Sequence, residues 1–166
     1  PVGGTAPELV AIALGNLDDG VAVAVRTMTH GANTYAFVAD FIGRVWTFDV
    51  SASELGVSDP VNPNPNEKLD PIGVWLAPPR EFDGRVPNIF DLEIVGNRLY
   101  VANVSRGVTI LDATDPANLD EVDGSPIDTP GLAEGIAVRA PAGEPVTIVV
   151  GDTRGGMRLY EIPSGP

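Results

Sequence analysis

One pattern, repeated three times along the chain, constrains the fold more than any other feature of the sequence. The stretches "FVADFIGRVWTFDV" from Phe37, "YVANVSRGVTILDA" from Tyr100 and "VVGDTRGGMRLYEI" from Val149 align without a gap. In each, an apolar run ends in Asp or Asn, a turn containing Gly follows, and a second apolar run ends in an acidic residue or just after one. Repeats of this spacing are typical of solenoids, propellers and other arrays. The chain is therefore predicted to consist of three like units.

Each unit is predicted to contain four short strands. Besides the two strands of each repeat core, apolar runs precede the cores at residues 21–27, 90–96 and 135–140, and others lie between the units at residues 8–14, 74–78 and 121–127. The connections are rich in Gly, Asn and Pro, as hairpin turns require. Short antiparallel strands in groups of four, without helices, are the pattern of β-propeller blades. We expect an all-β fold with about three four-stranded blades.

Three blades are too few for a closed propeller, because closed rings need about four to eight. Residues 1–166 are thus predicted to form a single propeller segment. It would be completed to a six-bladed ring by a second chain, belong to a longer chain, or remain a short open array. The strand at Glu8–Leu14 is expected to pair with the strand at Gly156–Ile162, which would cover two open edges. The predicted interface residues are Glu8, Leu9, Val10, Ile12, Leu14, Met157, Leu159 and Tyr160.

The segment at residues 51–71 departs from the repeat. Its Pro and Asn content argues against a strand or a long helix. It is predicted to be a surface loop insertion with a short helical turn near Ser53–Leu55. Loops of this length are often binding or packing elements, although a passive insertion is equally compatible with the sequence.

Charge and composition restrict the partners. Ten basic and 23 acidic residues give a formal charge of −13, which repels phosphate backbones and anionic lipid surfaces. No Cys is present, and no apolar run approaches the roughly 20 residues of a membrane span. We expect no nucleic acid and no membrane insertion. The expected partner is a second copy of the chain or a larger protein assembly.

The segment "DATDPANL", followed by "EVDGSPIDTPGLAEGIAV", resembles the LVIVD repeat, a β-propeller repeat found mostly in bacterial and archaeal surface or secreted proteins. Leu111-Asp112, Asp115-Pro116, Asn118 and Thr129-Pro130-Gly131 occupy the places of the repeat's Val-Asp, Ser-Asp-Pro, Asn and Thr-Pro-Gly. The resemblance implies a propeller fold and an extracellular, cell-surface or periplasmic location. It implies no reaction, because the family is defined by its repeat and shares no catalytic residues. We therefore expect a non-enzymatic binding or structural module.

Acidic residues are predicted to gather at one end of the blades, where a calcium ion is the one cofactor to consider. Asp40, Asp128, Glu134 and Asp152 are the candidate ligands, since Ca²⁺ binds oxygen donors. Their spacing matches no known calcium loop. Asp40, Asn103 and Asp152 recur at equivalent positions, which favours the other interpretation, that they cap turns by accepting backbone N–H groups.

An enzymatic alternative rests on a second resemblance. The stretch "EGIAVRAPAGEPVTIVVGDTRGGMRLYEI" is similar to part of a β-propeller phytase blade, which would imply a calcium-dependent phosphoester hydrolase. Glu134 and Asp152 would then be metal ligands, with Arg154 or Arg158 facing phosphate. His30, the only His, is predicted in a turn at the opposite end from the acidic loops. Trp46 and Trp75 are predicted to pack between blades.

Overall fold

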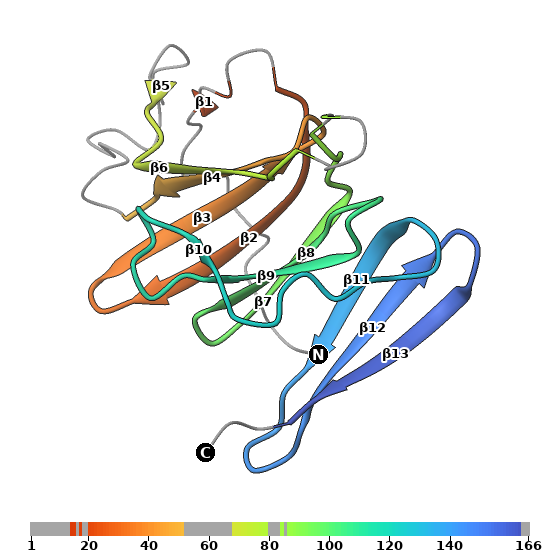
Figure 1. Cartoon of the computed structure of the whole chain (residues 1–166). Helices are drawn as coiled ribbons and strands as arrows, with labels where there is room; N and C mark the ends of the chain where they lie inside the picture. Colours follow the sequence, from red (N-terminus) through yellow and green to blue (C-terminus); the bar gives the residue numbers. More distant parts are fainter. Residues whose placement is uncertain are drawn as a thin grey trace, which may run out of the picture.

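The computed structural model describes residues 14–15, 17, 20–51, 68–79, 84 and 86–163. Within these residues the protein is all-β: it has three antiparallel sheets of four, four and three strands, and no helix. No helix of the described part is long and apolar enough to cross a membrane. Figure 1 shows the three sheets following one another along the chain.

The first sheet has the strand order β2-β3-β4-β6. Its strands are β2 (Ala22–His30), β3 (Asn33–Asp40), β4 (Arg44–Asp49) and β6 (Gly73–Leu76). The β2–β3 hairpin turns at Gly31, whose φ of 64° lies in the left-handed region that glycine adopts without strain. His30 pairs with Asn33 at this turn, while Ala22 pairs with Asp40 at the other end of the same hairpin.

The second and third sheets repeat this meander. The second sheet contains β7 (Asp91–Val95), β8 (Arg98–Ala102), β9 (Val108–Asp112) and β10 (Asp120–Glu121). The third contains β11 (Ala133–Arg139), β12 (Val146–Asp152) and β13 (Gly156–Ile162). A separate pair of two-residue strands, β1 (Leu14–Gly15) and β5 (Lys68–Leu69), runs parallel.

The strands predicted at 21–27, 90–96 and 135–140 and the between-unit strand at 74–78 are confirmed. The strand predicted at 121–127 was largely wrong: β10 is Asp120–Glu121, and Ile127 adds only an isolated bridge to Val108. The prediction that segment 51–71 holds no strand was wrong at its end, because Lys68–Leu69 forms β5. The helical turn predicted at Ser53–Leu55 lies outside the described residues.

The pairing predicted for the N-terminal strand is described only at its last residue. Leu14 pairs with Lys68 in β5 rather than with β13. Glu8, Leu9, Val10 and Ile12 lie outside the described residues. Met157, Leu159 and Tyr160 lie on β13, and β12 is the one neighbour of β13 among the described strands.

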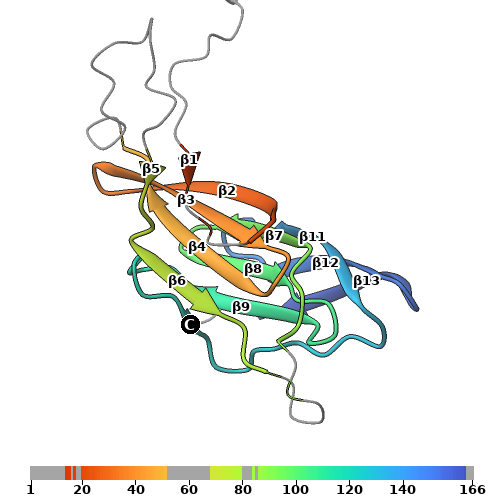
Figure 2. The same ribbon diagram turned by 90° about the horizontal axis from the view of Figure 1, so that it is seen from above.

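The sheets pack face to face, with the second sheet in the middle (Figures 1 and 2). Because side chains alternate along a strand, Leu99 and Val101 of β8 face the first sheet, whereas Tyr100 and Ala102 face the third. All four are buried. Two apolar cores result, one on each side of the second sheet, and each of the outer sheets contributes one face to a core.

The strands that come first in each sheet, β2, β7 and β11, lie next to one another. The Arg26 guanidinium on β2 pairs with the Glu93 carboxylate on β7, with both nitrogen–oxygen distances 3.3 Å. Asp91 at the start of β7 accepts a 3.1 Å hydrogen bond from the backbone N–H of Ile136 on β11. The three sheets are thus joined to one another along their first strands.

Candidate functional site

The turns that follow β3, β8 and β12 lie at one end of the three sheets, which we call the turn end. Each turn begins at one of the repeated residues Asp40, Asn103 and Asp152, all of which are buried. Asp40 shows what the residue does there. Its Oδ1 accepts the backbone N–H groups of Ile42 and Arg44 at 3.1 and 3.0 Å, so the side chain closes the turn.

The other carboxylate oxygen of Asp40 binds two side chains. Its Oδ2 accepts the Arg44 Nε at 2.6 Å and the Trp46 Nε1 at 2.9 Å. The Arg44 guanidinium also lies over the Trp46 ring, 4.6 Å from the ring centroid, in a cation–π contact. Among the described residues, every hydrogen bond to the Asp40 carboxylate comes from a donor of its own turn or the strand after it, which fixes the shape of the turn.

Asp152 repeats the arrangement in the third sheet. Its Oδ1 accepts the backbone N–H groups of Arg154 and Gly155, at 2.9 and 3.0 Å, and its Oδ2 accepts that of Gly131 at 3.0 Å. Burial raises the pKa of Asp152. These three N–H groups and the Arg158 guanidinium outweigh that effect and hold the pKa below its usual value. Asp152 is therefore a stable carboxylate at neutral pH.

The turn of the second sheet differs. Asn103 donates from Nδ2 to Thr109 Oγ1 at 3.3 Å, but its buried Oδ1 has no hydrogen-bond partner among the described residues. The following residue, Val104, has a φ of 32°, which is a strained value for a β-branched side chain. The capping interpretation is thus confirmed for Asp40 and Asp152, whereas Asn103 makes a side-chain bond in place of the backbone cap.

Two glycines let the preceding loops approach these caps. A Cβ at Gly20 would lie 2.6 Å from Asp40 Oδ2, and one at Gly131 would lie 1.9 Å from Asp152 Oδ1. In the second sheet Asn88 holds the corresponding place, and its side-chain amide instead donates to the carbonyl of Phe41. The loop that leads into each sheet therefore packs against the turn end.

Five exposed large apolar side chains lie around the turns of the turn end, and the other exposed ones among the described residues lie on or next to β2, β6 and β13. Phe41 and Phe90 meet edge to face with ring centroids 5.4 Å apart, and the Phe41 N–H donates to the Val21 carbonyl. Leu132 lies beside the third turn, where its carbonyl accepts the Thr153 N–H. We call the exposed set the turn-end patch: Val21, Phe41, Ile42, Phe90 and Leu132. Sequence reasoning missed it, although "DFIG" puts two apolar residues in a turn.

The four predicted calcium ligands are not brought together. Asp40 and Asp152 cap turns in different sheets, while Asp128 and Glu134 are exposed. Among the described residues no three or more His, Asp or Glu side chains are arranged to hold a metal ion. Asp152, the ligand that the phytase resemblance implies, uses both oxygens on backbone donors. This geometry offers no support for the calcium site.

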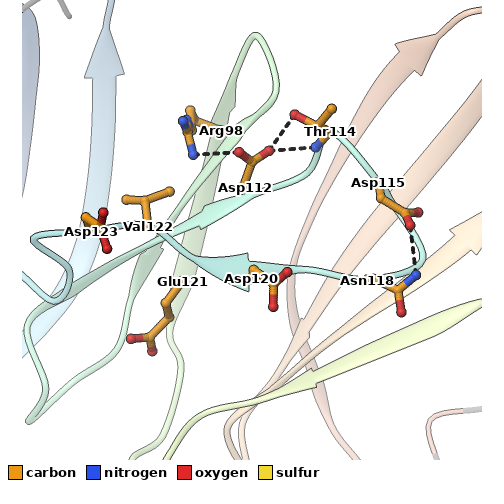
Figure 3. A pocket seen from close by; sticks show the side chains of 9 residues that line it. All are labelled: Arg98, Asp112, Thr114, Asp115, Asn118, Asp120, Glu121, Val122 and Asp123. Atoms are coloured by element: carbon orange, nitrogen blue, oxygen red, sulfur yellow. Dashed lines mark hydrogen bonds and ion pairs between the residues drawn. The ribbon is translucent and has the colours of Figure 1, made fainter.

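A hollow of about 460 Å³ lies beside β9 and β10, on the segment that carries the LVIVD resemblance. Figure 3 shows its lining: Arg98, Asp112, Thr114, Asp115, Asn118, Asp120, Glu121, Val122 and Asp123. Asp112 accepts the Arg98 guanidinium at 2.9 Å and both the N–H and the hydroxyl of Thr114. The two hydrogen bonds from Thr114 are the main reason that the pKa of Asp112 lies below its usual value.

Sequence reasoning placed the acidic residues at the turn end and missed this hollow, although the Asp-rich run from Asp112 to Asp123 marks it. The groups that line it are largely bonded to one another. Asp115, for example, accepts the Asn118 side-chain amide at 2.8 Å. Asp49 and Ser51 repeat the Asp112–Thr114 turn in the first sheet, where the Ser51 N–H donates to Asp49 Oδ1 at 2.9 Å. The pairing therefore recurs in two of the three units, while Glu161 and Pro163 hold the equivalent positions in the third.

Of the remaining predictions about single residues, those for His30 and Trp75 are confirmed. His30 lies in the hairpin turn at the end of the first sheet opposite Asp40. Trp75 is buried in the core between the first and second sheets. Trp46 is buried too, but it faces away from that core and bonds to Asp40.

Compared with models of known protein families, the chain matches none, and no curated protein matches its sequence.

Proposed function

We propose that this chain is a non-enzymatic, extracellular binding and structural module of the LVIVD-type β-propeller class. In this proposal each sheet is a blade, and the first strands β2, β7 and β11 face the propeller axis. The ion pair between Arg26 and Glu93 and the bond from Ile136 to Asp91 support that arrangement, because they join the sheets at the strand that a propeller places innermost. The LVIVD resemblance supports a location at the cell surface.

The proposed role in assembly rests on the apolar side chains that the two outer sheets expose. The second sheet is buried on both faces, whereas the first and third each expose several apolar side chains on their outer face. Val25 on the first sheet is 54% exposed, and Met157 and Leu159 on the third are 75% and 59% exposed. Large exposed apolar surfaces on a rigid scaffold mark sites of protein association. The chain is therefore suited to take part in a larger assembly that covers these faces.

The binding role would belong to the turn-end patch. Phe41 and Ile42 extend from the turn whose shape Asp40 fixes, and Leu132 follows Gly131, whose N–H is bound by Asp152, so little conformational entropy would be lost there when a partner binds. The caps keep the patch in one arrangement without a metal ion or a catalytic group.

The test of this proposal is whether the folded chain offers apolar surface for association. The chain would be titrated with a hydrophobic fluorescent dye, and its melting would be followed to confirm folding. A folded chain that binds dye, or that self-associates and thereby loses dye binding, supports an assembly module. A folded monomer that binds no dye at any concentration would overturn the proposal. Hydrolysis of p-nitrophenyl phosphate with Ca²⁺ above the buffer rate would contradict its non-enzymatic part.

A further inference from the structure

Each sheet has two unlike faces, and the repeat assigns every residue to one of them. We call the face that the first sheet turns toward the second its front face, and we use the same name for the face formed by the equivalent repeat positions in the other two sheets. On the repeat cores the front positions are Phe37, Ala39 and Val45 in the first sheet, Tyr100, Ala102 and Val108 in the second, and Val149, Gly151 and Met157 in the third. The intervening positions form the back face. The back positions are Ala36, Val38 and Phe48, then Leu99, Val101 and Leu111, then Ile148, Val150 and Tyr160.

Both contacts between sheets follow one rule: the front of one sheet packs on the back of the next. Phe37 and Val45 of the first sheet share a core with Leu99 of the second. Tyr100 and Val108 of the second share the other core with Ile148 of the third. The same set of repeat positions is therefore used twice, in the same order, within one chain.

Two faces are not packed on another of the three repeated sheets, and they are the two halves of that same contact. The front of the third sheet exposes Met157 and Leu159, which protrude into solvent. The back of the first sheet contains an apolar hollow of about 280 Å³. It is lined by Leu17 and Leu69, from the region of the β1–β5 pair, and by Ala22, Ala36, Val38, Phe48 and Val50 of the first sheet and its ends. Four of these lining residues, Ala36, Val38, Phe48 and Val50, correspond to Leu99, Val101, Leu111 and Ala113, which the first sheet buries on the second.

Val25 extends the same correspondence to the first strands. It pairs with Val38 across β2 and β3, just as Leu92 pairs with Val101 and Ile136 pairs with Val150. Leu92 and Ile136 are buried between sheets, while Val25 is exposed. The back of the first sheet thus has the composition of a covered face: Phe48 and Trp46 are buried there, whereas Val25, Val74 and Leu76 are exposed.

We propose that the occupant is a second copy of this chain, bound so that the front of its third sheet covers the back of the first. This inference rests on the proposed assembly role and names its partner. The second sheet lies between the two free faces, so they cannot pack on each other within one chain. Each can instead pack on the complementary face of another copy. Two copies joined by both pairs of faces form a closed ring of six sheets, a number within the range of known propellers. The contact is front to back, so a face does not bind its own kind.

Net charge sets the conditions of the experiment. Two copies, each with a formal charge of −13, repel one another, and salt screens that repulsion. Association is therefore expected to strengthen when NaCl is raised from about 0.05 to about 0.5 M, since this shortens the screening length to a few ångströms.

The test uses one charge on each face. Leu159→Glu blocks the front of the third sheet, and Val25→Glu blocks the back of the first. Ala142→Glu, in the exposed turn between β11 and β12, is the matched control. All three side chains are exposed in the single chain, so folding should survive, and circular dichroism and melting would verify it. Light scattering and sedimentation of each protein, and of an equimolar mixture of the two face variants, give the masses.

The proposal expects twice 17.3 kDa for the wild type and for Ala142→Glu. Each face variant alone should be a monomer, with association weakened at least about 100-fold because a charge is buried against apolar groups. Their mixture should form a one-to-one dimer, since one supplies an intact front and the other an intact back.

Three results would overturn the inference. A wild type that stays monomeric at high concentration and high salt rules out the second copy, while its dye binding would still support the assembly role with a different partner. A face variant that dimerises alone shows same-face pairing. A wild-type dimer unaffected by either variant places the contact elsewhere.

Discussion

The backbone N–H of Gly131 donates a 3.0 Å hydrogen bond to Oδ2 of Asp152, 21 residues further along the chain. The bond ties the loop that enters the third sheet to the turn that ends its second strand. It requires the loop backbone to lie against the carboxylate, and glycine is the one residue that leaves room for this approach.

Gly131→Ala should destabilise the protein by about 2 kcal/mol or more, because its Cβ would overlap Asp152 Oδ1 and crowd the Arg154 backbone. Denaturant unfolding at neutral pH measures the change. Gly135→Ala is the control, since a Cβ at that position would meet no described atom within 4 Å. Equal losses in the two variants would show that the close approach does not matter.

Asp40→Ala should lower the free energy of unfolding by about 3 kcal/mol, because it leaves the buried Trp46 Nε1 and the partly buried Arg44 guanidinium without their acceptor. The fluorescence of Trp46 in the native state should shift as its indole loses the hydrogen bond. The exposed Asp123→Ala should cost less than about 0.5 kcal/mol. An Asp40 variant as stable as the Asp123 variant would contradict the capping role.

Thr47→Val should raise stability by about 1 kcal/mol. The Thr47 hydroxyl is buried without a hydrogen-bond partner among the described residues, and the equivalent residues of the other repeats are Ile110 and Leu159. Valine keeps the shape and removes the unpaired polar atom. Urea unfolding compares the two proteins, with Thr109→Val as the contrasting case, because Thr109 Oγ1 accepts a bond from Asn103 and its loss should destabilise.

Acid should weaken the fold below about pH 4, the usual range of an unfolded aspartate. The pKa values of Asp152 and Asp112 are lowered in the folded protein, so both carboxylates bind fewer protons folded than unfolded. Their stabilisation is complete above the unfolded pKa and is lost as the pH falls through the folded one. Unfolding curves from pH 7 to pH 2 should show this decline, and Asp152→Asn should make it shallower. An identical acid dependence in that variant would assign the decline to other groups.

Calcium should leave the melting temperature unchanged. A native-state ligand at 100 times its Kd would add about 2.7 kcal/mol, which is easily detected. The carboxylate oxygens of Asp40 and Asp152 already accept hydrogen bonds from protein donors, so few of their lone pairs are left to coordinate Ca²⁺. Melting with millimolar Ca²⁺ and with EDTA makes the comparison, with Mg²⁺ as the ionic control. A calcium-specific rise of several degrees would restore the metal site.

The strands could be predicted because the repeat marks them three times over. Phe37, Tyr100 and Val149 occupy equivalent places in β3, β8 and β12, and a pattern shared by three copies is harder to misread than one copy alone. The caps at Asp40 and Asp152 were predictable for the same reason. Local turn chemistry favours Asp at these junctions.

What could not be predicted depends on contacts outside the repeat. The β1–β5 pair joins Leu14 to Lys68 across a segment with no counterpart in the other units, so no periodicity indicated it. The apolar turn-end patch was missed because Phe41 and Ile42 occupy turn positions held by Val104 and Ser105 in the next repeat. The hollow beside β9 and β10 forms only when Arg98 folds over Asp112 from a neighbouring strand.

The burial of the second sheet on both faces bears on how such a chain can change over evolutionary time. A substitution at Leu99 or Tyr100 must suit a neighbouring sheet on its own side, so this middle unit has the least freedom to drift. Duplication of a whole unit is less restricted. A copied sheet brings one front and one back, and it can be inserted between any two others without a new kind of contact. A gene of this design can therefore gain or lose entire units more easily than it can remodel one.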